Sequence, residues 1–431
     1  MLNLLDRKQI HKSQLLNWAS QYNYVAFYNS CGNLKDSYYQ YDCLLAVSNT
    51  CALLNNEDEH KENNLFEKLD ALQQQNKNWL FGYLGYDLKN EVEKLASKNE
   101  DHIKFPDLFF FEPEILLIKK DGNWYLEVHH NNLTINGLVK EIEAFKKTEQ
   151  VDITKASLKV KNRIDYASYQ KKIDAIKADI ENGIYYELNF CREFYAEDAI
   201  IDPYKVFKNL CKIAQPPMAA FLKMNNQFVL SASPERFLKK TGDKLIAQPM
   251  KGTIKRSEDA AADDFLKHQL KNSKKERAEN VMIVDLMRND LTRSAKLGSI
   301  NVENLFEVMT YKGFHTLVST VSATLRKGVS AVAAIKNAFP IGSMTGAPKV
   351  KACEKIEEYE NTKRGVYAGA IGYFNPNGDF DFNVVIRSLL YNTKSKYLSF
   401  HTGGAIVYDS TAQAEFEETE LKAENIFKAL A

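Results

Sequence analysis

The stretch from residue 367 to residue 408 reads YAGAIGYFNPNGDFDFNVVIRSLLYNTKSKYLSFHTGGAIVY, and it decides the fold class. Apolar runs alternate here with short turn sequences, in the order 367–375, Asn377-Gly378, 381–391, Lys394-Ser395-Lys396 and 397–408. Strands connected by such short turns pair antiparallel, because a parallel pair needs a crossover of a dozen or more residues. The stretch therefore predicts strands of an antiparallel sheet and argues against a doubly wound parallel sheet.

Elsewhere the chain combines further strands with amphipathic helices. Aromatic and β-branched runs at 24–28 and 108–111 predict strands in the first 150 residues. Between 169 and 180, apolar residues recur at helical spacing, and Asn182-Gly183 supplies a stop signal. The same criteria predict helices at about 203–213, 329–339 and 413–430. We therefore expect an α+β fold.

The length of the chain, 431 residues, allows a large buried core and would suit two or three domains. However, no Gly-, Ser- or Pro-rich linker and no internal repeat divides the sequence. The polar segment 146–161 is interpreted as a connector. We expect a strand-rich N-terminal region, 1–150, packed on a catalytic unit, 160–431.

Charge and cysteine usage exclude several classes of protein. The net charge is +1 and the basic residues are spread along the chain, so no nucleic-acid partner is indicated. The six cysteines form no C-x-x-C pair, which fits reduced thiols. No apolar stretch approaches the roughly 18 residues of a membrane helix, and the N-terminus does not resemble a signal peptide. We expect a cytoplasmic enzyme without a membrane partner. A nucleotide site is not indicated, because neither G-x-G-x-x-G nor a P-loop is present.

Two Glu-x-x-Glu pairs, Glu276 with Glu279 and Glu415 with Glu418, stand on predicted helices. Residues three apart share a helix face, so two such helices could present four carboxylates to one point. Such concentrated negative charge suits Mg²⁺, which prefers oxygen ligands. By chance alone, 56 acidic residues would give about seven such pairs, most of them plain surface charge.

Lys251 and Glu235 are candidates for covalent and acid–base chemistry. Lys251 stands in QPMKGT, after Pro249 and directly before Gly252. The freedom of backbone conformation at Gly252 could hold the amine at a turn facing a cleft. An amine becomes a nucleophile when burial or neighbouring cations favour its neutral form, and Lys255 and Arg256 are near in sequence. Glu235 ends an apolar strand, where burial could raise its pKa as a general acid requires. The competing interpretation for Lys251 is an ordinary exposed surface lysine. The competing interpretation for Glu235 is an ion pair with Arg236.

Three further features stand in apolar or small-residue surroundings. His315 precedes a β-branched run, where a structural histidine is the more common case. Arg387 lies in the apolar run NVVIRSLL, and a buried arginine needs an acidic partner from the protein or from a substrate. The loops 342–346 and 402–404 could hold an anion through backbone N–H groups, with ordinary turns as the alternative.

The order of these signals along the chain resembles that of the chorismate-binding enzymes. The resemblance covers residues 160–431 and rests on SPERF (233–237), QPMKGT (248–253), ERAENVMIVDLMRNDL (276–291), PIGSMTGAPK (340–349), YAGAIGYF (367–374), VVIRSLL (384–390) and AEFEETELKA (414–423). WLFGYLGYD (79–87) resembles a weaker N-terminal block. The resemblance implies a fold in which large mixed or antiparallel sheets pack as a central sandwich with helices outside.

The resemblance also implies a role for each matched residue. The two Glu-x-x-Glu pairs would bind the Mg²⁺ that holds the ring carboxylate of chorismate. Tyr367 and Arg387 would bind the enolpyruvyl carboxylate, and Glu235 would protonate the leaving C4 hydroxyl. The remaining matches are a pocket histidine, His315, and substrate-binding positions at Thr345, Gly403, Gly404 and Lys422.

Lys251 points to a subgroup of the family. Residues 249–253 read PMKGT, which is similar to the P-I-K-G-T of aminodeoxychorismate synthases, whereas anthranilate synthases have alanine in place of the lysine. The implied reaction is amination of chorismate at C4 in para-aminobenzoate and folate biosynthesis, through attack of Lys251 on C2. Ammonia would come from a separate glutamine amidotransferase subunit, since the chain lacks a G-x-C-x-G-x-Q block. Anthranilate synthase component I and an inactive, metabolite-binding homologue are the alternatives.

Three positions depart from the family pattern. Isochorismate and salicylate synthases have a water-activating lysine at the position of Glu187, which argues against hydration, and the aminating enzymes usually have glutamine there. Ala405 replaces a usual glycine in the carboxylate cradle. Ala219 replaces a serine in the tryptophan-binding pocket of related proteins, so no tryptophan binding is predicted.

Overall fold

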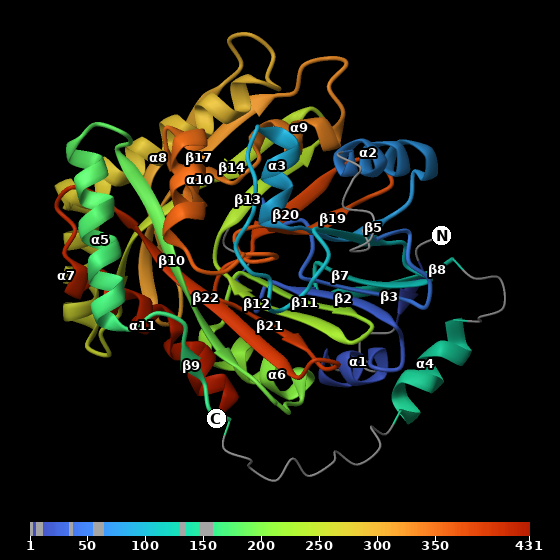
Figure 1. The fold of residues 1–431 in the computed structure, drawn as a ribbon. Coiled ribbons are helices and arrows are strands. Elements are labelled where there is room, and N and C mark those ends of the chain that lie inside the picture. The colour runs from blue at the N-terminus through green and yellow to red at the C-terminus, as the bar shows by residue number, and fades with distance from the viewer. Residues whose placement is uncertain (1–2, 6–11, 34–37, 55–63, 130–134, 146–157) are drawn as a thin grey trace.

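The computed structural model describes residues 3–5, 12–33, 38–54, 64–129, 135–145 and 158–431 (Figure 1). In these residues two large sheets carry the fold, and all pairings between their strands are antiparallel. The antiparallel arrangement predicted from the C-terminal turns is confirmed.

The first sheet contains twelve described strands, with β9 (Lys161–Asn162) pairing beside the main path on β10. Its order is β1 (Asn3–Leu5), β8 (Asn123–Val128), β7 (Ile115–Lys120), β3 (Cys43–Ser48), β2 (Tyr24–Asn29), β11 (Met218–Met224), β12 (Gln227–Ser233), β21 (Ser388–Asn392), β22 (Tyr397–Ile406), β10 (Glu187–Ala196) and β18 (Gly346–Ala347).

The second sheet contains ten described strands, with β16 (Asn301–Thr310) pairing on β17. Its order is β15 (Met250–Lys255), β17 (Phe314–Thr324), β14 (Lys244–Gln248), β13 (Arg236–Thr241), β20 (Phe380–Val384), β19 (Ala370–Phe374), β5 (Leu80–Leu84), β6 (Leu108–Phe111) and β4 (Leu53–Leu54).

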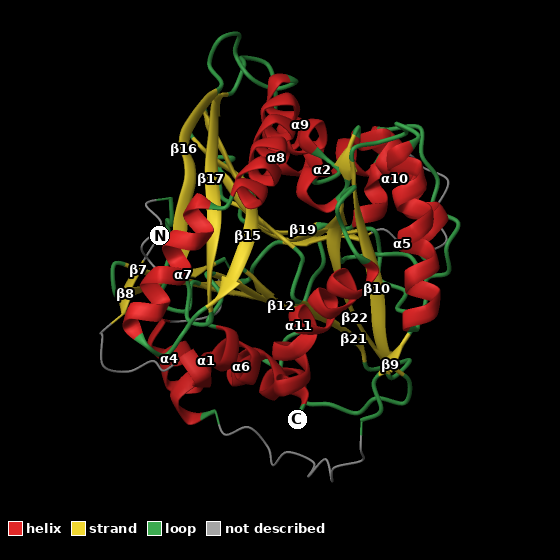
Figure 2. Cartoon of the chain, turned by 90° about the vertical axis from the view of Figure 1, so that its left-hand side faces the viewer, coloured by secondary structure: helices red, strands yellow, loops and turns green. Residues whose placement is uncertain are grey.

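The helices lie around these sheets (Figures 1 and 2). They are α1 (Lys12–Ala19), α2 (Leu65–Asn76), α3 (Lys89–Val92), α4 (Ile135–Ala144), α5 (Tyr166–Glu181), α6 (Pro203–Ala214), α7 (Ala260–Asn272), α8 (Lys274–Thr292), α9 (Ala331–Ala338), α10 (Lys349–Tyr359) and α11 (Ala412–Leu430), with short 3₁₀ turns at Tyr86–Leu88 and Gly342–Met344. None of the helices in the described residues is long and apolar enough to cross a membrane.

The core has the layers of a sandwich. Between the sheets, aromatic and aliphatic side chains from both interdigitate, for example Tyr24 of β2 with Phe109 of β6 at 5.5 Å between ring centroids. The outer face of the second sheet packs against α2, α8 and α9. The outer face of the first sheet packs against α1, α4, α6 and α11. This confirms the expected sandwich of antiparallel sheets with helices outside.

Strands from the N-terminal 150 residues enter both sheets. β2 pairs with β11 in the first sheet, and β5 pairs with β19 in the second. The hydrogen-bonded core is therefore continuous between the proposed N-terminal region, 1–150, and the proposed catalytic unit, 160–431. Most of the predicted connector, at 146–157, lies outside the described residues.

Local signals placed α5 correctly, because Asp165 accepts a hydrogen bond from the backbone of Ser168 as N-cap and Asn182 is the C-cap. The single strand predicted at 381–391 is wrong. β20 ends at Val384 and β21 begins at Ser388, and the two strands belong to different sheets. The three residues between them carry the chain across the sandwich, and Arg387 adopts a left-handed backbone conformation there, with φ of 52°.

Candidate active site

A cavity of about 960 Å³ opens where both sheets meet α8 and α11. In Figure 2, β15 lies between α8 above and α11 below. This volume is within the range of small-molecule sites, about 300–1,000 Å³. Eleven of the thirteen predicted site residues line it: Glu235, Lys251, Glu276, Glu279, Tyr367, Arg387, Gly403, Gly404, Glu415, Glu418 and Lys422. Segments separated by up to 187 positions, from Glu235 to Lys422, therefore contribute to one site.

The two glutamates of α8 lie close to β15, the strand that carries Lys251. Glu276 packs against Gly252, where an added Cβ atom would lie 2.7 Å from Glu276 Oε2. Gly252 also has φ of +80°, so this position needs glycine for both conformation and space. Burial raises the pKa of Glu276, and it raises the pKa of Glu279 to about 7.

The two glutamates of α11 pack against the backbone of β22. A Cβ atom at Gly404 would lie 3.0 Å from Glu415 Oε2. Glu415 accepts a hydrogen bond from the Ser410 hydroxyl at 2.7 Å, and burial raises its pKa. For Glu418, burial acts in the same direction, but its ion pair with Lys422 lowers the pKa below the ordinary value.

The donor chemistry of this set fits a hard divalent cation. Carboxylates from two helices line one cavity, and the charge of Glu418 raises the pKa of Glu276 across it. Such repulsion between neighbouring carboxylates is relieved by Mg²⁺. In the described part of the chain, however, no three His, Cys, Asp or Glu side chains lie close enough together to hold a metal ion. The two Glu-x-x-Glu pairs therefore line the same cavity, but in this structure their carboxylates do not converge on one position.

Lys251 lies in the cavity wall with its amine held by an acidic partner. Its Nζ is 3.1 Å from Glu187 Oε1, and the two side chains are 13% and 2% exposed. Burial opposes protonation of the amine, but the carboxylates of Glu187, Glu279 and Glu235 outweigh burial and raise the pKa of Lys251. The expectation that neighbouring cations favour a neutral amine is therefore wrong for this structure.

Glu235 has the environment of a general acid. The side chain is buried, and burial raises its pKa to about 7. The Ser343 hydroxyl donates to Glu235 Oε1 at 2.6 Å and Lys251 supplies a positive charge, but neither offsets the burial. At neutral pH a substantial fraction of this carboxyl is protonated, as donation to a leaving group requires.

The cavity is also lined by an arginine, Arg387, that could bind a substrate carboxylate. Arg387 donates to the backbone oxygen of Lys422 at 3.2 Å, and among the described residues no carboxylate forms an ion pair with it. Arg387 is half-buried, and this burial lowers its pKa. Lys422 Nζ donates to Gly403 O at 2.7 Å beside it. Since a buried cation needs an anion, this corner of the cavity suits a substrate carboxylate.

Two predicted site residues do not line the cavity. His315 is fully engaged on the other side of β17, with Nδ1 2.9 Å from the Thr310 hydroxyl and Nε2 3.1 Å from Asp263. Thr345 is buried, and its hydroxyl donates to the backbone oxygens of Ile341 and Gly342. The polar side-chain atoms of His315 and Thr345 are thus hydrogen-bonded to protein groups outside the cavity.

Sequence reasoning missed His401 and did not assign Glu187 to Lys251. His401 lines the cavity, stacks on Tyr367 at 5.1 Å between ring centroids, and has no hydrogen-bond partner for Nδ1 among the described residues. Burial lowers its pKa and so favours the neutral form of the ring. Its position two residues before Gly403 was the available signal. The Glu187 pairing spans 64 positions and left no local signal.

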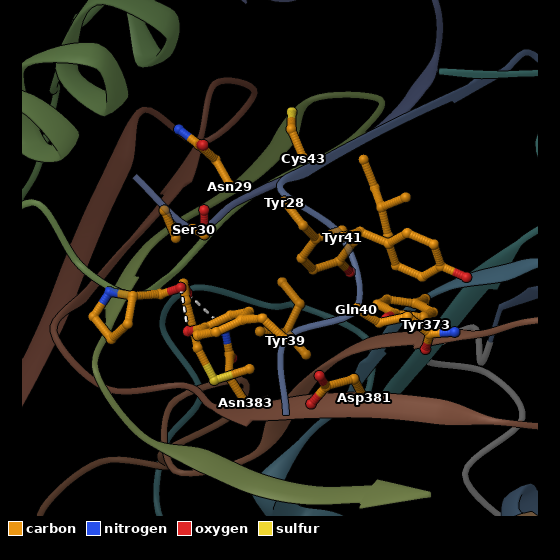
Figure 3. A pocket seen from close by; sticks show the side chains of 15 residues that line it. Tyr28, Asn29, Ser30, Tyr39, Gln40, Tyr41, Cys43, Tyr373, Asp381 and Asn383 are labelled. Atoms are coloured by element: carbon orange, nitrogen blue, oxygen red, sulfur yellow. Dashed lines mark hydrogen bonds between the residues drawn. The ribbon is translucent and has the colours of Figure 1, made fainter. Parts of the chain in front are cut away.

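Ala219 lies in a second, smaller pocket between the sheets, which Figure 3 shows with the aromatic rings that fill it. The cavity measures about 50 Å³, which is room for only a few water molecules. Tyr39 extends across it and donates to the backbone oxygen of Pro217. Of the positions that depart from the family pattern, Ala219 thus lies apart from the large cavity, whereas Ala405 lines it.

Comparison with known proteins places these observations in a family. A model described as chorismate binding enzyme matches residues 25–428. Aminodeoxychorismate synthase component 1 of Escherichia coli is 34% identical over 350 residues, which cover 81% of this chain and 76% of that protein. The chloroplastic aminodeoxychorismate synthase of Arabidopsis thaliana is 35% identical over 361 residues, covering 79% of this chain and 39% of the plant protein. The chain thus spans well under half the length of the plant relative.

A solved structure of anthranilate synthase component I from Streptococcus pneumoniae is also similar. Its TM-score is 0.72 at 28% identity, and the match covers 80% of each chain.

Proposed function

Because the chain belongs to the chorismate-binding enzymes, we propose that it catalyses the Mg²⁺-dependent amination of chorismate at C4, giving 4-amino-4-deoxychorismate. The observation that carries this proposal is the position of Lys251. Its amine lies in the same cavity as a protonatable Glu235 and an arginine without a carboxylate partner in the described residues. Relatives that are named aminodeoxychorismate synthase support this product, which would serve the synthesis of para-aminobenzoate and folate.

The residues of the cavity support a covalent route. Lys251 would attack C2 of chorismate while Glu235 donates its proton to the departing C4 hydroxyl, which leaves as water. Ammonia then adds at C4 and the bond between Lys251 and C2 breaks. Two easier displacements replace one difficult displacement, and the lysine is returned unchanged.

Binding would follow the charges of the cavity. Arg387, with Tyr367 beside it, would hold the enolpyruvyl carboxylate. Mg²⁺, when bound, neutralises the ring carboxylate and fixes its orientation. Glu276, Glu279, Glu415 and Glu418 would hold the ion, since their carboxylate oxygens line the cavity and are the ligands it prefers.

Ammonia would be supplied by a separate glutamine amidotransferase subunit. The designation "component 1" of the Escherichia coli relative supports a two-subunit enzyme. Location in the cytoplasm stays a prediction from the sequence.

The alternative is anthranilate synthase component I, and the similarity to the Streptococcus pneumoniae structure favours it as the second candidate. Incubation of the chain with chorismate, an ammonium salt and Mg²⁺, followed by mass analysis, tests both. We expect 4-amino-4-deoxychorismate. Anthranilate with pyruvate would establish the alternative, and absence of any turnover would leave only the inactive homologue.

A further inference from the structure

Glu187 is a buried acid that the proposed reaction has not yet used. It lies on β10 at 1% exposure, and its Oε1 accepts the hydrogen bond from Lys251 Nζ at 3.1 Å. Its Oε2 has no hydrogen-bond partner among the described residues. A buried carboxylate with one oxygen unpaired is costly, so the residue is poorly explained as a stabilising element.

The backbone around Glu187 fixes the carboxylate in place. Tyr186 N donates to Ala347 O and Asn189 N donates to Thr345 O, both at 2.7 Å. Gly346 lies so close that an added Cβ atom would meet Glu187 O at 2.1 Å. The strand therefore cannot retreat, and the carboxylate stays within hydrogen-bond reach of the amine.

The other charged groups that face the amine already have different tasks. Glu279 on α8 and Glu235 after β12 both act on Lys251 electrostatically, and in the described residues neither forms an ion pair with it. Glu235 must carry a proton for the leaving hydroxyl, and Glu279 is one of the proposed metal ligands. Glu187 is thus the carboxylate placed to exchange a proton directly with Lys251.

We propose that Glu187 is the proton acceptor that converts the Lys251 ammonium into the attacking amine and returns the proton when the lysine departs. The inference rests on the proposed amination.

The proton balance closes over the cycle. Lys251 first passes a proton to Glu187, and the free electron pair of its nitrogen then forms the bond to C2. At the same time the C4–O bond breaks, and Glu235 donates its proton to the C4 hydroxyl, which leaves as water. When ammonia has bonded to C4 and the C2–N bond has broken, the excess proton on the new C4 ammonium goes to Glu235. The Glu187 proton returns to Lys251. Chorismate and ammonia thereby give the aminated product and water, with every protein group restored.

The test is the Glu187→Gln variant, which keeps the shape and an acceptor oxygen for Lys251 but cannot take the proton. At pH 7 we expect kcat to fall about 100-fold or more, with the KM for chorismate changed less than threefold. Lys251 must then lose its proton to water. At constant free ammonia the ratio of the variant's rate to that of the unmodified protein should therefore rise about tenfold per pH unit above pH 7, because loss of the Glu235 proton slows both proteins alike. The deficit should thus narrow by pH 9.

Two further variants complete the design. Glu187→Asp retains a carboxylate and should recover much of the rate with the pH profile of the unmodified protein. Glu193→Gln removes a buried charge from the same strand, where Glu193 pairs with Arg163 at 2.9 Å, and should leave the pH profile unchanged. Should Glu187→Gln fail to fold, the Glu187→Asp profile alone decides.

A deficit that is equal at all pH values, or full activity of Glu187→Gln at pH 7, overturns the role of Glu187. The same outcome leaves the proposed amination standing if the unmodified protein makes 4-amino-4-deoxychorismate. Absence of that product from the unmodified protein instead overturns the proposed function.

Discussion

Replacing Glu235 with glutamine should remove catalysis and at the same time stabilise the protein above neutral pH. Glutamine has nearly the same shape and can still accept the hydrogen bond from Ser343. It has no proton to donate to the C4 hydroxyl, so kcat should fall by about 10²- to 10⁴-fold.

The gain in stability follows from burial of the carboxyl. Burial raises the pKa of Glu235 from 4.5 to about 7, so between these values the native state holds a proton that the unfolded state has lost. The wild-type free energy of unfolding therefore declines as the pH rises from 4.5 through 7. One pKa unit corresponds to about 1.4 kcal/mol, so the loss amounts to about 3 kcal/mol. Glutamine avoids this loss.

Chemical denaturation of both proteins at pH 5 and pH 8 measures the effect. Relative to wild type, Glu235→Gln should be more stable by about 3 kcal/mol at pH 8, with most of this difference absent at pH 5. Glu197→Gln is the matched control, because Glu197 is exposed and Lys161 holds its pKa below the usual range. An equal stability difference at both pH values would show that Glu235 is not held protonated in the native state.

Three other substitutions test the remaining parts of the site. Lys251→Ala should abolish 4-amino-4-deoxychorismate formation in the mass assay, and an unchanged yield would refute the covalent step. Glu418→Gln should raise the Mg²⁺ concentration needed for half-maximal rate about tenfold or more, because a neutral amide replaces one of the four carboxylate ligands. If activity kept its original Mg²⁺ dependence, the metal assignment would be wrong. Arg387→Lys should raise the KM for chorismate by about 10-fold or more, since an ammonium cannot bind a carboxylate in the bidentate manner. An unchanged KM would place the enolpyruvyl carboxylate elsewhere.

Local sequence signals predicted the elements well where a helix or strand is complete in itself. The cap residues of α5 and the hairpin turn at Asn377-Gly378 act within a few positions, so their effect is visible in the sequence. The apolar run around Arg387 failed as a predictor because periodicity does not reveal that a chain changes sheets midway. The strand ends at Val384 because the chain there leaves the second sheet and joins the first, which depends on pairing with segments distant in sequence.

The residue types of the site were likewise visible in the sequence, but their surroundings were not. Glu276, Glu415 and Lys251 were identified by motif and do line one cavity. His315 was identified in the same way, yet its ring nitrogens contact Thr310 and Asp263 outside that cavity. A motif specifies which chemical group is present, whereas neighbours from other elements decide where its polar atoms find partners.

The amino-acid order by itself determined that this chain forms antiparallel strands with covering helices, and that it carries an amine and several acids in a family-like order. Tertiary structure alone decided the charge of that amine, by placing Glu187 of β10 3.1 Å from it, and brought His401 to the cavity wall. The physical reason is range. Propensity, periodicity and turn geometry act over a few residues, but electrostatic and desolvation effects act through space between segments that only the fold brings together.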